Sequence, residues 1–447
     1  SCESIHRLNL VRFLRIEIIK YQLSESRRSR RSRRMQRRPS DSSGSENEDD
    51  EEEEIECYRK GGYHAVRPGD PFSNGRYIAQ RKLGWGQFST VWLAYDSLSS
   101  KFVALKIQKS APHFAQAAIH EIEILTAMAA GDPSNSKCVV HLLDHFKHTG
   151  PNGQHHCMVL EFLGDSLLKL IQYNRYKGLP MKQVKEICRC VLVGLDYLHS
   201  NLRLIHTDLK PENILLNSPM DSSKDPVKSK LTPILDRQEQ SQQQSTMSVI
   251  EKKLKRRARR AAETIARKRG EPRRGIESIE VSCKVVDMGN ACWEGKELAE
   301  EIQTRQYRAP EVILGSGYSF SVDMWSFGCF AFEVATGEML FTPKEGDDYS
   351  EDEDHLALMM EVLGKIPKKL AVGGTKAKDY FDRYGDLKRI RRLKFTSLQN
   401  VLIHKYSFSQ SDANHFADFL LPILDFSPHN RPTARQCLDH PFLRSDS

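Results

Sequence analysis

The sequence predicts an α+β fold of two lobes, a small strand-rich first lobe and a larger helical second lobe. Residues 77–107 alternate β-branched and aromatic residues with turn glycines, a pattern typical of antiparallel strands. From Leu167 onward most segments show helical spacing of their apolar residues, including 181–200 and 321–336. A chain of 447 residues, 39% of them hydrophobic, is long enough to bury a sizeable core.

Two low-complexity segments set the boundaries of these lobes. Residues 1–56 combine an Arg/Ser repeat with an acidic run, which buries too little apolar surface to offset chain entropy, so we expect a disordered tail. Residues 217–280 are rich in Ser, Gln, Lys and Arg, which predicts a basic, largely disordered spacer on the surface. The first lobe should therefore cover 57–163, and the second 164–445 with the spacer as an interruption.

The net charge of +8 is unevenly distributed and does not describe a nucleic-acid-binding surface. Between Lys252 and Arg274, twelve Lys and Arg stand against two Glu, which gives this segment +10 and leaves the rest at about −2. The ten cysteines form no Cys-x-x-Cys pair, which argues against a zinc site or disulfide framework and for a reducing cytosolic or nuclear compartment. The chain has no run of about eighteen apolar residues, so we expect no transmembrane helix.

Residues 205–213, Ile-His-Thr-Asp-Leu-Lys-Pro-Glu-Asn, carry the groups that phosphoryl transfer needs. Asp208 could orient an attacking hydroxyl and accept its proton, Lys210 could offset phosphate charge, and Asn213 could hold magnesium. The spacing His-x-Asp-x-x-x-x-Asn is a highly specific signal for a loop that catalyses phosphoryl transfer. The alternative is a polar turn that carries these residues by chance.

A glycine-containing hairpin is expected earlier in the chain, between two strand patterns. Glycines let the backbone approach phosphates closely enough for its N–H groups to cover them. The nucleotide-covering residues would be Leu83, Gly84, Trp85, Gly86, Gln87, Phe88, Ser89, Thr90 and Val91. Gly-x-Gly alone is a weak signal because hairpin turns also use glycine, and Ser89 takes the place of a third glycine.

Two further charged residues adjoin apolar strand patterns. Lys106 lies in one, where an unpaired ammonium would be costly, and could pair with Glu121 of the next helix or, alternatively, with Glu123. The competing interpretation is a strand-edge lysine that reaches solvent. Asp287 follows the apolar strand pattern 281–286 and could hold magnesium together with Asn213, because oxygen ligands suit that cation.

Taken in order along the chain, these motifs resemble those of protein kinases. The resemblance implies a bilobal protein-kinase fold that uses ATP and Mg2+. It implies four catalytic residues, Asp208, Lys210, Lys106 and Glu121, and two metal ligands, Asn213 and Asp287. It also implies a hinge at 158–163, where Glu161 and Leu163 bind adenine through backbone groups. A pair between Glu311 and Arg431, and a brace on the catalytic loop by Asp323, are expected as well.

Longer segments are similar to one family, the SR-protein kinases or SRPKs. They are 83–93 (LGWGQFSTVWL), 287–293 (DMGNACW) and 304–311 (TRQYRAPE), and Lys210 fits the serine/threonine pattern. The nearest alternative is a CLK (LAMMER) kinase, which would show Asp-Phe-Gly and Glu-His-Leu-Ala-Met-Met-Glu-Arg. The sequence has Asp-Met-Gly and only a partial match to the second motif.

The SRPK resemblance implies a serine/threonine kinase that phosphorylates serines in Arg/Ser-rich domains of SR splicing factors and thereby regulates mRNA splicing. It implies an enzyme found in the cytoplasm and the nucleus, with a spacer that governs how the enzyme is divided between the two compartments. We expect a monomer that binds neither nucleic acid nor membrane directly. Thr207 stands where many kinases carry an Arg that receives a phosphorylated activation loop, so we expect constitutive activity.

An acidic segment from Asp347 to Asp354 could receive a polyarginine substrate, because guanidinium forks pair with carboxylates. The resemblance places substrate docking at Glu338, Asp354, Glu361 and Lys405. A solvated acidic loop at a helix start explains the same run of acids.

Two rival functions remain open. A pseudokinase scaffold that binds Arg/Ser-rich tails without catalysis would fit the departures at Ser89, Thr207 and Met288, although none removes a magnesium ligand. An RNA-binding protein that uses its Arg-rich segments would need aromatic stacking residues beside the charges, and these are lacking.

Overall fold

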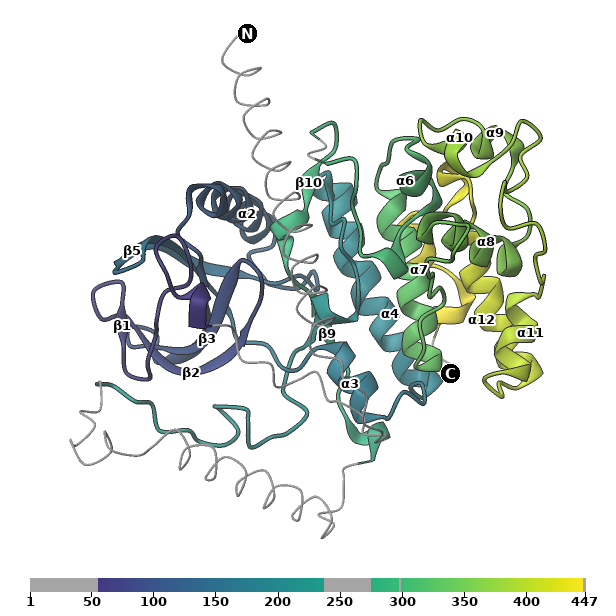
Figure 1. Cartoon of the computed structure of the whole chain (residues 1–447). Helices are drawn as coiled ribbons and strands as arrows, with labels where there is room; N and C mark the ends of the chain where they lie inside the picture. The colour runs from purple at the N-terminus through teal and green to yellow at the C-terminus, as the bar shows by residue number, and fades with distance from the viewer. Residues whose placement is uncertain (1–54, 237–274, 297–298, 445–447) are drawn as a thin grey trace, which may run out of the picture.

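Two lobes lie side by side in the computed structural model of this chain, which describes residues 55–236, 275–296 and 299–444 (Figure 1). The first lobe holds an antiparallel sheet of six strands in the order β1-β2-β3-β4-β6-β5. Its strands are β1 (Pro71–Phe72), β2 (Tyr77–Trp85), β3 (Ser89–Asp96), β4 (Lys101–Gln108), β5 (Leu142–Gly150) and β6 (Gly153–Glu161). Strands β2 to β4 confirm the antiparallel strands predicted from the alternation in 77–107.

Helix α2 (Pro112–Gly131) packs on this sheet and carries a charged side chain inward (Figure 1). Glu121, Leu125 and Met128 are all buried, and their spacing of three or four residues places them on one face of the helix. The periodicity that buries the apolar residues of α2 therefore also turns Glu121 toward the interior of the lobe.

The second lobe is built around α7 (Ser321–Thr336), in agreement with the helical spacing predicted there. Every residue of α7 after Ser321 is buried, as expected of a helix that is apolar on nearly all sides. It contacts α4 (Met181–Asp196) and α12 (Gln410–Ile423). The other α-helices described here are α3 (Leu167–Tyr173), α6 (Pro310–Leu314), α8 (Glu351–Leu363), α9 (Lys368–Ala371), α10 (Ala377–Tyr380), α11 (Leu398–His404) and α13 (Ala434–Leu438).

Four short strands hold the polar motifs together between the lobes. Strand β7 (Leu204–Ile205) pairs with β10 (Cys292–Trp293), and β8 (Ile214–Leu216) pairs with β9 (Cys283–Val285). The loop 206–213 joins β7 to β8, and Asp287 follows two residues after β9. These two pairings bring motifs that are about 80 residues apart in sequence to one place.

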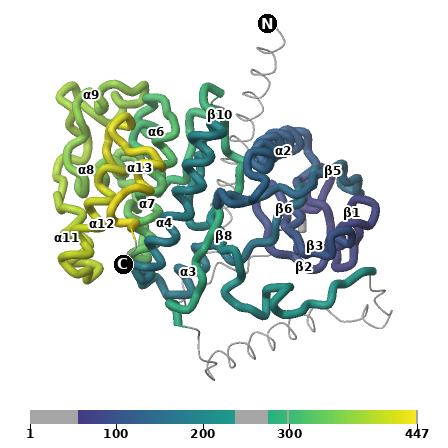
Figure 2. The backbone as a smooth tube through the Cα atoms, turned by 180° about the vertical axis from the view of Figure 1, so that it is seen from behind, coloured from purple at the N-terminus to yellow at the C-terminus, as the bar shows by residue number. Residues whose placement is uncertain are grey.

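Residues 217–236, which we call the crossing segment, run from the second lobe onto the first (Figures 1 and 2). The Gln80 side chain on β2 exchanges two hydrogen bonds, of 2.9 and 2.7 Å, with the backbone of Ile234. Arg81 donates to the carbonyl of Lys224 at 3.0 Å. This segment differs from the disorder expected of the spacer, because β2 supplies polar partners for its backbone.

The far end of the spacer lies on the second lobe. Gln183 of α4 donates hydrogen bonds of 2.9 Å to the carbonyls of Ile276 and Ile279. Residues 1–54 and 237–274, for which the sequence predicts disorder, lie outside the described residues. Within the described part of the chain, no helix is both long and apolar enough to span a bilayer.

Candidate active site

The loop between β7 and β8 is braced by Asp323 near the start of α7. Its carboxylate accepts hydrogen bonds from the backbone N–H groups of His206 (2.7 Å) and Thr207 (2.8 Å) and lies 2.8 Å from His199 Nε2. Burial opposes ionisation, but the contact with His199 and the backbone donors hold the pKa of Asp323 below its ordinary value. Thr207 has a φ of 69°, which costs a β-branched residue about 1–3 kcal/mol. The brace thus holds a strained turn that presents Asp208.

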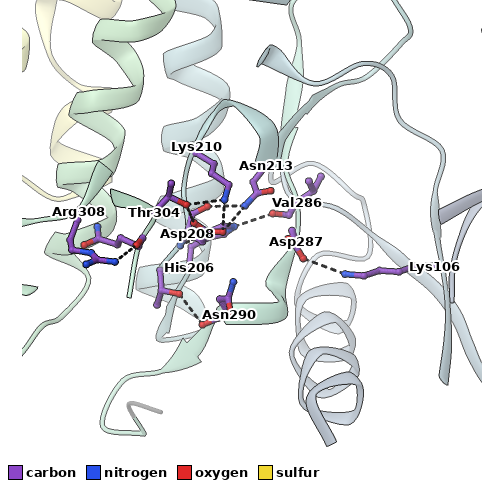
Figure 3. A network of polar contacts seen from close by, with 12 residues as sticks. Lys106, His206, Asp208, Lys210, Asn213, Val286, Asp287, Asn290, Thr304 and Arg308 are labelled. Carbon is purple, nitrogen blue, oxygen red and sulfur yellow. Dashed lines mark hydrogen bonds and ion pairs between the residues drawn. The ribbon is translucent and has the colours of Figure 1, made fainter. Parts of the chain in front are cut away.

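Asp208 is the centre of a polar network (Figure 3). Lys210 Nζ lies 3.0 Å from Asp208 Oδ2, and the Thr304 hydroxyl donates to Oδ1 at 2.7 Å. The same hydroxyl accepts from Lys210 Nζ at 2.9 Å, and Asn213 Nδ2 donates to the Asp208 carbonyl at 2.9 Å. These contacts fix the direction of the carboxylate and leave it acceptor capacity for a substrate hydroxyl.

The sequence reasoning missed the role of Thr304. Thr304 is the first residue of the segment 304–311, and the similarity of that segment to the SRPK family was the one indication that the sequence offered. A threonine by itself gives no indication that its hydroxyl will bridge a base and a cation.

Lys106, Glu121 and Asp287 form a charged triad between the lobes. Lys106 Nζ lies 2.6 Å from Glu121 Oε1 and 3.3 Å from Asp287 Oδ1. Burial opposes the charge on Lys106, but the two carboxylates outweigh it and raise the pKa of the ammonium. Burial raises the pKa of Glu121, whereas Lys106 lowers that of Asp287. The structure joins Lys106 to Glu121 and leaves the alternative partner Glu123 exposed.

Asp287 and Asn213 offer oxygen ligands that fit a magnesium ion. The Val286 N–H donates to the Asn213 carbonyl at 2.9 Å, which places the two residues next to each other (Figure 3). The Asp287 side chain is 43% exposed, whereas those of Lys106 and Glu121 are 13% and 3% exposed, so Asp287 is the member of the triad that a ligand from solvent can reach. Because Mg2+ keeps waters and phosphate oxygens as ligands, two protein oxygens are a suitable contribution.

The β2–β3 hairpin carries the predicted phosphate-covering residues, 83–91. The Gly86 N–H donates to the Ser89 carbonyl at 2.9 Å and closes the turn. A Cβ added at Gly84 or Gly86 would meet no atom within 4 Å, so no steric contact inside the protein requires glycine at these two positions. The space above them fits the close approach of a phosphate chain. From the protein side, the Tyr63 hydroxyl donates to the Gly86 carbonyl at 2.6 Å, a contact that sequence reasoning missed.

The hinge residues Glu161 and Leu163 lie where β6 leaves the first lobe. The Glu161 carboxylate is 2.8 Å from Lys284 Nζ and accepts from Asn135 Nδ2 at 3.0 Å. Its side chain therefore ties the hinge to β9. Contact of Glu161 and Leu163 with adenine stays a prediction, and for Glu161 it would use the backbone.

The second lobe contains the expected pair of Glu311 and Arg431. Arg431 donates from both terminal nitrogens to the Glu311 carboxylate, at 2.6 and 2.7 Å, and both side chains are buried. This bidentate pair fastens the end of the activation segment, residues 287–311, to the core of the lobe.

The four predicted docking residues occupy two places. Glu338 and Lys405 form an exposed ion pair, with Lys405 Nζ 2.7 Å from Glu338 Oε2. Asp354 and Glu361 lie two turns apart on α8, and each accepts a backbone N–H of a neighbouring loop at 2.8 Å. The structure thus pairs the first two residues with each other and sets the other two along one helix.

Comparison with known proteins agrees with this geometry. The protein kinase domain model matches residues 77–232 and 276–443. A serine/threonine-protein kinase SRPK of Physarum polycephalum is 44% identical, over 87% of this chain and 90% of the relative. The chain belongs to the SRPK family of serine/threonine protein kinases.

Other SRPK-family relatives cover similar shares. Protein kinase dsk1 of Schizosaccharomyces pombe is 38% identical, over 87% of this chain and 84% of its own. SRSF protein kinase 3 of Homo sapiens is 36% identical, over 86% of this chain and 89% of its own. The predicted kinase fold and SRPK membership are therefore confirmed.

Proposed function

We propose that this SRPK-family kinase uses ATP and Mg2+ to phosphorylate serines in Arg/Ser-rich domains of SR splicing factors and so regulates mRNA splicing. The observation that carries the proposal is the network around Asp208, in which Lys210 and Thr304 hold a carboxylate close to Asn213, the neighbour of Asp287. The name of the human relative, SRSF protein kinase 3, supports the substrate class.

The side chains divide the work of phosphoryl transfer between them. Asp208 orients the serine hydroxyl and accepts its proton as the oxygen attacks. Lys210 offsets the charge of the transferred group, and Lys106, fixed by Glu121, holds phosphate oxygens of the nucleotide. Mg2+ held by Asn213 and Asp287 would neutralise phosphate charge.

Acidic residues before and on α8 support a preference for arginine-rich substrates. Glu345, Asp347 and Asp348 are exposed just before this helix. Carboxylates of this kind pair with guanidinium forks through two parallel hydrogen bonds. We infer that an Arg/Ser tail docks along this face, with Asp354, Glu361, Glu338 and Lys405 as the docking residues.

We also propose that the kinase is active without phosphorylation of its activation segment. The Thr207 hydroxyl donates to the Asn290 carbonyl at 2.9 Å, and Arg308 donates to the carbonyls of Ile302 and Gln303 at 3.0 Å each (Figure 3). The first bond ties the start of the segment to the catalytic loop, the two bonds of Arg308 hold its later part together, and the pair of Glu311 and Arg431 fastens its end. Phosphatase treatment should leave the rate within about twofold, and a large loss would refute the proposal.

A kinase assay tests the proposed function directly. Asp208→Asn should lower phosphate transfer to an Arg/Ser peptide by at least about 100-fold, because the base is lost. Asp418→Asn is the matched control, since Asp418 is 80% exposed and lies away from the site. If the unmodified chain binds the peptide and ATP without transfer, the pseudokinase scaffold replaces this proposal.

The spacer is proposed to set the partition between cytoplasm and nucleus. Deletion of 252–274 removes the basic run and leaves residues 237–251 to connect the crossing segment to the second lobe. We expect near-normal turnover and a changed nuclear fraction. An unchanged distribution would remove the localisation hypothesis.

A further inference from the structure

The Arg/Ser repeat near the start of this chain has the composition of the proposed substrate. Ser29 and Ser32 each stand between two arginines, within a segment, 24–38, that contains eight arginines. A kinase that phosphorylates Arg/Ser-rich domains, as proposed above, therefore carries an acceptor of the same chemistry on its own chain.

The structure fixes the point at which this tail joins the first lobe. The described chain begins at Ile55, and Glu56 is exposed. The backbone that follows is held by hydrogen bonds of 3.0 Å. The Tyr63 N–H donates to the Cys57 carbonyl, and the Gly61 N–H donates to the carbonyl of Asn152 in the turn between β5 and β6. The tail is thus tethered to the fold at a defined place.

This place adjoins the hairpin that is proposed to cover the nucleotide phosphates. Lys82 Nζ on β2 donates to the Tyr58 hydroxyl at 3.3 Å, and Lys82 directly precedes the hairpin residues 83–91. The Tyr63 hydroxyl donates to the Gly86 carbonyl of the same hairpin at 2.6 Å. The tether therefore starts beside the site where phosphate would be transferred.

The tether is long enough for its serines to reach that site. Ser32 lies 23 residues before Ile55. An extended chain of this length spans about 75 Å, whereas a small domain is about 30 Å across. The Asp208 side chain is 14% exposed, so a hydroxyl can reach its carboxylate. A short tether holds an acceptor at an effective concentration on the order of millimolar, which favours reaction within one molecule.

We propose that this kinase phosphorylates Ser29 and Ser32 of its own chain, within the same molecule, at the Asp208 site. The serine oxygen attacks the γ-phosphorus of ATP, so that an O–P bond forms, the bond from that phosphorus to the β-phosphate oxygen breaks and ADP leaves. The serine proton passes to the Asp208 carboxylate. Each serine consumes one ATP, and the step needs no reactant beyond those of the proposed function, on which this inference rests.

Phosphopeptide mapping of the full chain after incubation with ATP and Mg2+ tests the proposal. Phosphate should appear on Ser29 and Ser32 before it appears on three serines of the same tail that have no arginine neighbour, Ser42, Ser43 and Ser45. Because acceptor and site belong to one molecule, the initial rate per enzyme should stay within about twofold over a roughly 100-fold dilution. Earlier phosphate on the three control serines, or a rate per enzyme that falls in proportion to the dilution, would overturn the proposal.

An Arg/Ser peptide added to the same reaction separates this inference from the proposed function. Transfer to the peptide without phosphate on Ser29 or Ser32 would refute the inference and leave the proposed function intact. Transfer to neither acceptor would contradict the proposed function itself.

Two variants assign the source and the position of the phosphate. The Asp208→Asn chain should gain no phosphate on its tail, and a gain would show that another kinase is responsible. Ser29→Ala combined with Ser32→Ala should lose most of the tail phosphate and still phosphorylate the peptide. Tail phosphate that persists at its original level in this double variant would contradict the assignment of these two serines.

Discussion

The hydroxyl of Thr304 is expected to contribute directly to the rate of phosphate transfer. Thr304→Val keeps the shape of the side chain and removes two hydrogen bonds, one to the Asp208 carboxylate and one from the Lys210 ammonium. Hydrogen bonds to charged groups contribute about 1.5–3 kcal/mol each. The direct contact of 3.0 Å between Lys210 and Asp208 remains and should retain part of the orientation. A net loss of about 1.5–3 kcal/mol corresponds to a kcat about 10- to 100-fold lower.

Steady-state kinetics with an Arg/Ser peptide and varied ATP measure this effect. The KM for ATP should change little, because Thr304 contacts the base and not the β2–β3 hairpin. Thr304→Ser restores the hydroxyl and should bring kcat back to within a few-fold of the unsubstituted enzyme. A kcat for Thr304→Val within twofold of the original, in protein of unchanged melting temperature, would refute the reasoning.

Three other predictions follow from described contacts. Tyr63→Phe keeps the ring and removes the hydrogen bond to Gly86, so we expect a KM for ATP about 2- to 10-fold higher, with the KM for peptide unchanged. Burial and two neighbouring histidines lower the pKa of His64 from its ordinary 6.5 to about 4. Between these pH values the unfolded chain binds more protons at this residue, so the contribution of His64 to stability should be lost as the pH falls from 6.5 to 4. His64→Gln should therefore lose less stability over this range, and equal denaturant curves for the two proteins would contradict this. Arg431→Lys breaks the bidentate pair with Glu311 and should cost at least about 2 kcal/mol in urea unfolding, whereas an unchanged midpoint would count against a structural role for the pair.

Sequence reasoning succeeded where local spacing and burial agree. The bounds of α7 coincide with the helical pattern at 321–336, because a helix that is apolar on all sides leaves little choice of register. A charge in an apolar strand needs a partner nearby, which predicted an acidic partner for Lys106, and the kinase pattern selected Glu121 over Glu123. The brace by Asp323 was expected only from the resemblance to protein kinases, and its hydrogen bonds to the catalytic loop confirm it.

The contacts that were missed depend on tertiary packing between polar groups. Thr304 and Asp208 are 96 positions apart, and no periodicity links them. The contact of Tyr63 with Gly86 depends on how the segment before β1 folds back on the sheet. The composition of 217–236 correctly indicates few apolar contacts. It does not reveal that the side chain of Gln80 can form hydrogen bonds with the backbone of this segment.

The spacer is anchored on both lobes, and the crossing segment supplies the anchor point on the first lobe. Ile234 is held on β2, and the chain returns at Ile276 beside α4, with 38 residues, 237–274, between the described ends. Doubling such a connection costs only about 0.6 kcal/mol of closure entropy, so lengthening is nearly free. Shortening has a limit, because residues 237–274 must always span the distance between the two anchor points. A movement of one lobe relative to the other therefore also changes the distance that this connection has to span.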